Sequence, residues 1–216
     1  MKLRHLVRRW AVSYTRRGKY SPVGVWFHWI MAALIVFQLG LGWMLSRYQV
    51  GGDKLAAYQL HAELGMSILL LALLRFGWRL FIPDPINDAD RPGWQSKAAH
   101  VTQGLFYGLF ALLPLSGWAM WSSLQPVGPL RVAGLIAIPS MPFYTLAPAW
   151  QYRILDWAEN VHVVGVFALA LLVPLHVAAA LKHHFWDRDD VVRGILPEIE
   201  DDATAPDHRQ YTPRAG

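Results

Sequence analysis

The chain has no cysteine among its 216 residues. This absence excludes disulfide bonds, thiolate metal sites, iron–sulfur clusters and the Cys-x-x-Cys-His attachment of c-type haem. Charged residues are also scarce, at 16%, whereas hydrophobic residues make up 54%. This composition is too apolar for an ordinary soluble domain. Much of the chain must therefore lie in segments that are not exposed to water.

Four apolar runs account for the composition. They cover approximately residues 26–45, 60–74, 101–121 and 161–181. Most of them approach the length of about 20 residues that a helix needs to cross a bilayer, and the second reaches it if Tyr58 and Trp78 are its interfacial ends. The alternative, buried helices of a soluble protein, would leave little chain to cover four such runs. The sequence predicts an all-α integral membrane protein with a bundle of four transmembrane helices.

The distribution of lysine and arginine predicts the orientation of these helices. Seven lie in residues 1–20, which contain no acid, four lie in residues 75–97, and five lie from residue 182 onward. The connections on the other side carry only four: Arg47, Lys54, Arg131 and Arg153. Because basic residues concentrate on the cytoplasmic side of membrane proteins, we expect both termini to be cytoplasmic. The net charge of +5 is thus a signal of topology, and we expect no nucleic acid as a partner.

This orientation divides the chain into three parts. We expect a basic cytoplasmic segment at 1–22, a four-helix membrane domain at 23–186, and an acidic, disordered cytoplasmic tail at 187–216. Residues 122–148 are rich in proline and glycine and are predicted to form an irregular outer loop.

Five of the nine histidines lie in or beside the predicted helices at informative positions. His28 is in the first turn of the first helix, His61 opens the second, and His100 precedes the third. His162 and His176 lie 14 residues apart in the fourth. That spacing places both rings on one face, within about 40°, and separates them by about 21 Å along the axis. Ionisable residues inside a membrane are costly and are candidates for function.

The topology pairs four of these histidines at two levels. The first helix runs outward from the cytoplasm, whereas the second and fourth helices run inward. His28, near the start of the first helix, and His176, near the end of the fourth, therefore both lie near the cytoplasmic edge. By the same reasoning His61 lies near the outer edge with His162. Two neutral imidazoles on opposite sides of a flat ring are what six-coordinate b-type haem requires, since it has no covalent attachment. The sequence predicts two haem b groups, with these four histidines as iron ligands.

Three glycines fall near the same levels. Gly42 lies 14 residues after His28 and about 21 Å higher, so we expect it to form a wall of the outer haem pocket. Gly65 and Gly165 follow the outer pair by about one turn and would let a porphyrin approach the backbone. Ordinary packing between membrane helices is the alternative explanation for these glycines.

Four stretches of the sequence carry a resemblance to a known family. They are "FHW" at 27–29, "LHAELGMSILLLALLRFGWRL" at 60–80, "LPLSGW" at 113–118 and "LHVAAALKHHFWDRDDVVRGILP" at 175–197. On these residues the chain resembles the bacterial cytochrome b561 family, four-helix membrane cytochromes with two b haems. Carried over position by position, the resemblance implies the same four haem ligands, and His100 matches a histidine at the start of the family's third helix.

The resemblance also implies a function. Members of the family transfer electrons in the bacterial inner membrane between a periplasmic donor and membrane quinone. Some are similar to superoxide oxidases, which pass an electron from superoxide to ubiquinone. A positive outer surface would attract that anion, but here the outer basic residues are balanced by Asp53, Glu63, Asp156 and Glu159. Two other roles stay open: a haem-bearing membrane subunit of a larger dehydrogenase, and a haem-free metal transporter.

Polar groups gather at the predicted cytoplasmic edge. Arg75 lies 14 residues after His61, where it would hold a haem propionate or simply mark the cytoplasmic end of its helix. His100, His183 and His184 would bond quinone oxygens or propionates, or relay protons, because histidine titrates near neutral pH. Contact of His183 and His184 with lipid headgroups at a helix C-terminus is the alternative.

Overall fold

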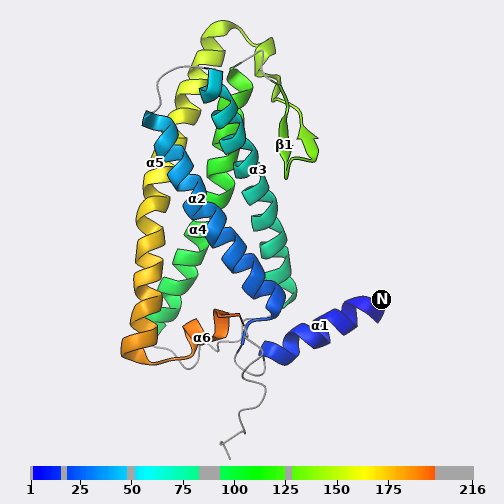
Figure 1. Cartoon of the computed structure of the whole chain (residues 1–216), viewed down its shortest axis with the longest axis vertical. Helices are drawn as coiled ribbons and strands as arrows, with labels where there is room; N and C mark the ends of the chain where they lie inside the picture. The colour runs from blue at the N-terminus through cyan, green and yellow to red at the C-terminus, as the bar shows by residue number, and fades with distance from the viewer. Residues whose placement is uncertain (1, 16–18, 48–51, 83–92, 125–127, 198–216) are drawn as a thin grey trace, which may run out of the picture.

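The computed structural model describes residues 2–15, 19–47, 52–82, 93–124 and 128–197. Its main body is a bundle of four long helices (Figure 1). They are α2 (Pro22–Arg47), α3 (Gly52–Phe81), α4 (Gly93–Ser123) and α5 (Pro148–Lys182). Each is long and apolar enough to cross a membrane. The predicted all-α bundle of four transmembrane helices is confirmed.

The four helices extend beyond the apolar runs of the sequence. The largest extension is in α5, which begins at Pro148 instead of near residue 161. Proline suits the first turn of a helix, where its missing N–H has no partner to lose. The polar residues that follow can continue the helix, since its backbone bonds are internal. The upper end of α5 therefore projects past the upper ends of α2 and α3 (Figure 1).

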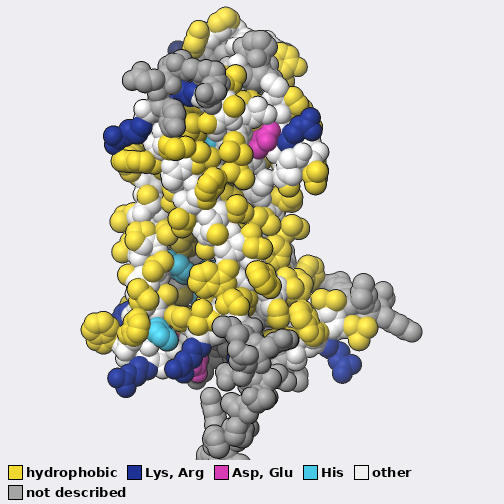
Figure 2. Space-filling model, in the orientation of Figure 1, with side chains coloured by type: hydrophobic (Ala, Val, Ile, Leu, Met, Phe, Trp, Pro, Cys, Tyr) yellow, Lys and Arg dark blue, Asp and Glu magenta, His cyan; other side chains and the backbone are white. Residues whose placement is uncertain are grey.

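The apolar core lies in the middle of the bundle. Met31 and Ile35 of α2, Ala72 of α3 and Leu169 of α5 are buried together, and partly buried side chains of α4 such as Phe106 pack against them. The outward faces of the helices carry many exposed large apolar side chains, which form a broad band in Figure 2. Charged side chains lie above and below this band. That distribution is the one a bilayer-spanning bundle requires.

The connection between α4 and α5 is more regular than the irregular outer loop that the sequence predicts. After α4 ends, β1 (Leu130–Val132) and β2 (Ile136–Ile138) form an antiparallel hairpin. A short 3-10 helix, η2 (Pro142–Thr145), follows. The prediction of an irregular loop over 122–148 is therefore wrong for these residues. Proline and glycine mark the turns, but the β-branched residues between them favour short strands.

The hairpin is held against α3 by its own backbone. The N–H of Arg131 donates to Glu63 Oε1 at 3.2 Å, and the N–H of Ala133 donates to Ser67 Oγ at 2.8 Å. The side chain of Leu130 is buried at 1% exposure on the inner side of the hairpin. These contacts anchor the backbone of the hairpin to two polar side chains of α3.

The lower end of the bundle carries both described chain ends (Figure 1). Here α1 (Lys2–Thr15), which the sequence analysis does not predict, precedes α2, and α6 (Val191–Ile195) follows the π-helical turn η3 (His183–Asp187). The predicted disordered tail from residue 187 is therefore wrong as far as residue 197. The remainder of that tail lies outside the described residues.

Contacts with α2 and with Tyr20, which lies just before it, explain why the first part of the tail is folded. Tyr20 N–H donates to the carbonyl of Gly194 at 3.1 Å, and Trp29 Nε1–H donates to the carbonyl of Ile195 at 2.8 Å. These partners lie far away in the sequence, so the local composition of the tail does not reveal them.

Candidate cofactor-binding site

The lower histidine pair joins the first and last helices of the bundle. The ring centroids of His28 on α2 and His176 on α5 lie 6.3 Å apart, with an angle of 57° between the planes. Arg75 of α3 places Nη2 at 3.5 Å from Nδ1 of His28. The ring of Phe106 on α4 meets His176 edge-on at 5.3 Å. All four helices thus contribute a side chain at this level.

The upper pair joins α3 and α5. The ring centroids of His61 and His162 lie 6.2 Å apart, with an angle of 67° between the planes. Nδ1 of His162 is 3.0 Å from the carbonyl oxygen of Leu113 and 3.0 Å from Oγ of Ser116. A proton on Nδ1 is donated to these acceptors on α4. This fixes the ring and leaves Nε2 for a ligand, as is usual for metal-binding histidines.

The ring of His61 sits against α2. A Cβ added at Gly42 would lie 3.1 Å from Cε1 of His61, so this position tolerates no larger side chain without movement. The Nδ1 atom of His61 is buried and has no hydrogen-bond partner among the described residues. Gln38 of α2 donates from Nε2 to the backbone carbonyl of His61 at 2.6 Å. The unpartnered nitrogen and the cradle beside it are features of a site built for a further group.

The spacing of each pair fits one metal ion with two imidazole ligands. A bond from a metal ion to an imidazole nitrogen is about 2 Å. Two such bonds plus half a ring at each end span about 6 Å, which agrees with the observed 6.3 and 6.2 Å. Since the chain offers imidazoles and no thiolate, the donor set is that of a b-type haem without covalent attachment.

The two pairs are well separated. His162 and His176 lie on the same helix, and their spacing corresponds to about 21 Å along its axis. The core residues Met31, Ala72 and Leu169 fall between them. The arrangement is two imidazole pairs at different depths of the bundle, with tightly packed apolar side chains in between.

A model of the prokaryotic cytochrome b561 family matches residues 19–198 of the chain. The chain belongs to the prokaryotic cytochrome b561 family. Membership implies binding of b-type haem and electron transfer in a bacterial membrane, which the protein crosses several times. The predicted resemblance is confirmed.

Curated relatives cover nearly the whole bundle. The chain is 28% identical to cytochrome b561 homolog 2 of Escherichia coli (strain K12), over 85% of this chain and 94% of that protein. It is 27% identical to the probable superoxide oxidase CybB of Yersinia pestis, over 83% of this chain and 97% of that protein. It is 26% identical to cytochrome b562 of Cereibacter sphaeroides, over 81% and 93%.

His100 is not placed as predicted. It lies inside α4, which begins at Gly93, instead of preceding the helix, because the helix continues past the apolar run at its lower end. Its side chain is exposed, and its Nδ1 is 2.8 Å from the carbonyl oxygen of Ser96 one turn earlier. This contact is local and joins His100 to its own helix.

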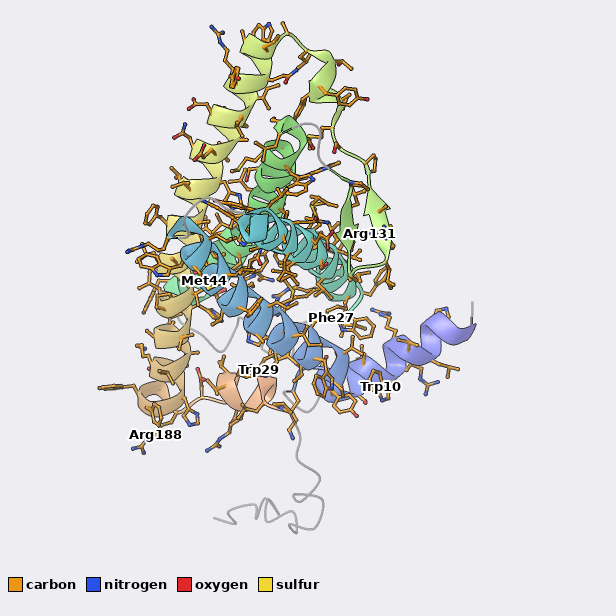
Figure 3. All side chains as sticks on the ribbon, turned by 45° about the horizontal axis from the view of Figure 1, so that its top comes forward. Trp10, Phe27, Trp29, Met44, Arg131 and Arg188 are labelled. Carbon is orange, nitrogen blue, oxygen red and sulfur yellow. The ribbon has the colours of Figure 1, made fainter. Side chains whose placement is uncertain are left out.

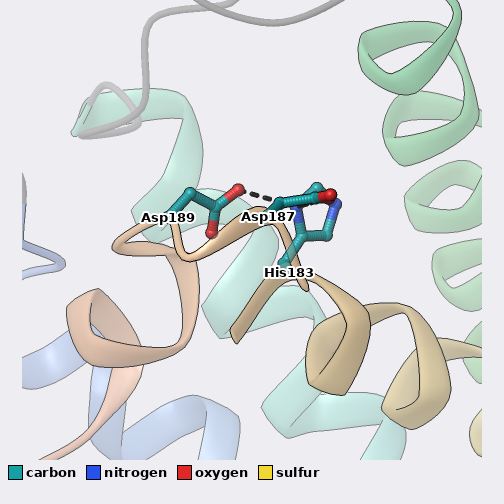
Figure 4. A group of neighbouring side chains, drawn as sticks. All are labelled: His183, Asp187 and Asp189. Atoms are coloured by element: carbon teal, nitrogen blue, oxygen red, sulfur yellow. Dashed lines mark hydrogen bonds and ion pairs between the residues drawn. The ribbon is translucent and has the colours of Figure 1, made fainter. Parts of the chain in front are cut away.

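His183 lies in a cluster at the lower end of α5. Its Nδ1 is 2.6 Å from Oδ2 of Asp189 and 3.2 Å from Oδ2 of Asp187 (Figure 4). Asp187 is also paired with the ammonium of Lys182 at 2.6 Å. The side chains of His183, Asp187 and Asp189 are close enough to hold a metal ion. However, the ammonium of Lys182 already neutralises the carboxylate of Asp187. The firm result is a histidine–carboxylate pair, His183 with Asp189.

Several residues at the two levels are missed by the sequence analysis. They are Gln38, Phe106, Ser116 and Gly117, of which Gly117 would place a Cβ 3.5 Å from Cε1 of His162. Polar residues inside apolar runs are a usable signal, and it singles out Gln38 and Ser116. Nothing in the sequence marks Phe106, because aromatic residues are common on any membrane helix.

The neighbours of Gly65 and Gly165 bear on the choice between the two explanations for these glycines. A Cβ at Gly65 would lie 3.5 Å from Nε2 of Gln38, and a Cβ at Gly165 would lie 2.9 Å from Cδ2 of Leu113. Both glycines face side chains of an adjacent helix. The contacts support the packing explanation for these two glycines.

Proposed function

We propose that this protein carries electrons across the membrane through two b haems, from a donor on the periplasmic side to membrane quinone. The observation that supports it most directly is the pair of histidine levels, one near each end of the bundle, each with ring centroids just over 6 Å apart. A single histidine pair could hold a haem near only one face of the membrane. Two pairs separated by about 21 Å could hold one haem near each face, so that an electron can enter at one face and leave at the other.

In this proposal each histidine pair holds one haem, which supplies one-electron redox chemistry when bound. His28 and His176 hold the lower haem, and His61 and His162 hold the upper one. Arg75 neutralises a propionate at the lower level, where it already lies 3.5 Å from His28. The apolar core between the levels excludes water and ions from the path.

The rest of the chain orients these ligands. The carbonyl of Leu113 and the hydroxyl of Ser116 hold the Nδ1 proton of His162, so Nε2 stays free and the ring keeps one orientation. Gly42 leaves space beside His61. We propose that it forms a wall of the upper haem pocket.

The quinone is proposed to bind at the lower end, which the distribution of basic residues assigns to the cytoplasm. Full reduction of a quinone to a quinol takes two electrons and two protons. The pair of His183 and Asp189, joined at 2.6 Å, is proposed to deliver these protons, because an imidazole can act as a general acid or base and the carboxylate holds the ring in place. Arg75, His100 and His184 line the same end of the bundle as candidate contacts for quinone oxygens.

Superoxide is the first donor to test, because one relative is named a probable superoxide oxidase. Two superoxide ions, each losing one electron to become dioxygen, would supply the two electrons for one quinone. The four basic residues predicted for the outer side are matched by four acidic ones, Asp53, Glu63, Asp156 and Glu159, so that side carries no net charge. Steering of the anion by charge is therefore expected to be weak.

The experiment is a reduction assay in liposomes that contain quinone. Purified protein is offered superoxide, and haem absorbance and quinol are followed together. Reduction of the haem followed by quinol formation supports the proposal. A haem that is reduced while no quinol appears would reject quinone as the acceptor, and a haem that superoxide does not reduce would reject superoxide as the donor.

A second function is favoured by the outer end of α5. Trp150 and Tyr152 lie there beyond the upper histidine pair, at 57% and 72% exposure, and aromatic side chains are enriched in protein interfaces. In this alternative the protein is the membrane subunit of a larger dehydrogenase, and a periplasmic subunit is the donor. Copurification with a haem-reducing periplasmic protein, lost in a Trp150→Ala, Tyr152→Ala double variant, would favour it.

A further inference from the structure

The helix α1 has two faces of opposite character. At 100° per residue, Leu6, Val7 and Trp10 fall within an arc of about 100°, whereas Arg8 and Arg9 fall on the other side of the helix. Residues 1–20 carry seven basic residues and no acid. The pattern is that of an amphipathic helix with a strongly cationic polar face.

The apolar face is open in the structure. Leu6 is 61% exposed and Trp10 is 43% exposed, and Trp10 meets the ring of Tyr14 edge-on at 5.4 Å. Ala11, in contrast, is fully buried. The side of the helix at Ala11 is therefore covered, while its large apolar side chains stay open over 39–61% of their surface.

The position of α1 suggests what covers this face. It extends sideways from the end of the bundle at which α2 begins and α6 packs, with Trp10 on its length (Figures 1 and 3). The apolar band of the bundle ends at this level, and dark blue side chains lie along the lower edge of the region (Figure 2). A helix at this place lies where acyl chains give way to headgroups. The family model begins at residue 19, so α1 lies outside the part of the chain that the family shares.

We propose that α1 lies in the plane of the membrane surface, with its apolar side chains among the acyl chains and its arginines on the headgroups of anionic phospholipids. An in-plane amphipathic helix gains from both contacts, and each basic residue near an anionic leaflet adds to the attraction. A second copy of the chain is a poor occupant, because two segments with seven cations each and no acid repel one another. With the proposed orientation, the lipid is that of the cytoplasmic leaflet.

The absence of cysteine makes this contact directly testable in the full-length protein. Val7→Cys and His5→Cys place a single label on opposite faces, about 160° apart around the helix. Each variant is labelled with an environment-sensitive fluorophore and reconstituted in bilayers of phosphatidylcholine, with or without phosphatidylglycerol. Quenching is measured with a nitroxide on the lipid acyl chain and with aqueous iodide. The haem spectrum of each variant reports that the bundle is intact.

The expected result is quenching of the Val7 label by the acyl-chain nitroxide in bilayers with phosphatidylglycerol, and quenching of the His5 label by iodide only. An Arg8→Glu, Arg9→Glu double substitution should reduce acyl-chain quenching at position 7 to the level seen without phosphatidylglycerol. Equal behaviour of the two labels would overturn the proposal. The proposal would also be overturned if acyl-chain quenching at position 7 were the same with and without phosphatidylglycerol and the same after the charge reversal. The anionic headgroups would then play no part in the contact. A label at position 7 shielded from both quenchers would show instead that a protein covers the face.

Discussion

His28 and His176, which come from the first and last helices of the bundle, face each other with their ring centroids 6.3 Å apart. His61 and His162 repeat this relationship at the other end, at 6.2 Å. Among the described residues, the ion pairs that involve a histidine are those of His183, and neither imidazole pair has a carboxylate partner of this kind. Binding of b-type haem, which membership of the family implies, gives both pairs a common purpose.

Gly42 tests the upper pocket. Gly42→Phe should displace the haem proposed between His61 and His162 and leave the lower one intact, because even a Cβ at this position would lie 3.1 Å from the His61 ring. Haem content and the low-temperature absorption spectrum of the purified variant measure the effect. About half of the haem should be lost.

Gly40→Phe is the matched control for that substitution. It lies on the same helix, about 200° away around the axis, and a Cβ there would meet nothing within 4 Å. It should spare both spectral components. Two normal haems in stably inserted Gly42→Phe protein would show that this glycine does not face a cofactor.

Ser116 tests the orientation of the His162 ring. In Ser116→Ala the ring keeps the carbonyl of Leu113 but loses the hydroxyl at 3.0 Å. With fewer acceptors for its Nδ1–H, the His162 ring is a less basic ligand and donates less electron density to the iron. The redox potential of the upper haem should therefore rise. The loss of one hydrogen bond, about 1 kcal/mol, corresponds to at most about 40 mV for a one-electron couple. Redox titration measures it.

Ser123→Ala serves as the control for Ser116→Ala. Its hydroxyl donates to a carbonyl of its own helix, that of Ala119, at 2.9 Å, as Ser116 also does, but it contacts no histidine ring among the described residues. The redox potential of the upper haem in Ser123→Ala should stay at the wild-type value. Equal shifts in the two variants would mean that the effect is one of helix structure and not of the His162 ring.

Gly165 tests the packing of α4 on α5. Gly165→Leu should destabilise the bundle by about 1–3 kcal/mol, the usual cost of overpacking, because its Cβ alone would lie 2.9 Å from Cδ2 of Leu113. Thermal unfolding in detergent measures the loss. Gly108→Leu on α4, where a Cβ meets nothing within 4 Å, should leave the stability nearly unchanged or raise it. A variant pair of equal stability would contradict the packing role of Gly165.

The quinone site can be located by photolabelling. A quinone analogue should mark residues near Arg75, His100 or the His183–Asp189 pair, since the proton-carrying groups gather at that end. His183→Gln should slow quinol formation more than haem reduction, because it removes the proposed proton carrier and leaves the proposed haem ligands in place. Labels confined to the outer hairpin and the upper end of α5 would place the quinone on the other side.

The four-helix architecture follows from the sequence because it depends on few, strong signals. Apolar runs of spanning length leave a chain little choice in a bilayer. The same is true of the histidine pairing. Once the direction of each helix is known from the basic residues, helical geometry brings His28 level with His176, and the structure places these rings side by side. Their role as haem ligands remains a prediction.

The features that the sequence does not reveal depend on contacts between distant segments. The hairpin is held by Glu63 and Ser67 of α3, and α6 is held by Trp29. Local composition describes both segments as irregular because their partners lie elsewhere in the chain. The position of His100 inside α4 is missed for another reason: the apolar run marks where a helix meets lipid, and the helix itself continues into water.

The central claim is that each imidazole pair holds one haem, and double substitution tests it most directly. Haem per chain and the low-temperature α-band are measured for purified protein with two histidines replaced by alanine. The His28→Ala, His176→Ala protein should keep one haem with an unaltered spectral component, as should His61→Ala, His162→Ala with the other component. The crossed variant His28→Ala, His61→Ala should keep none. A crossed variant that retains one normal haem would contradict the pairing.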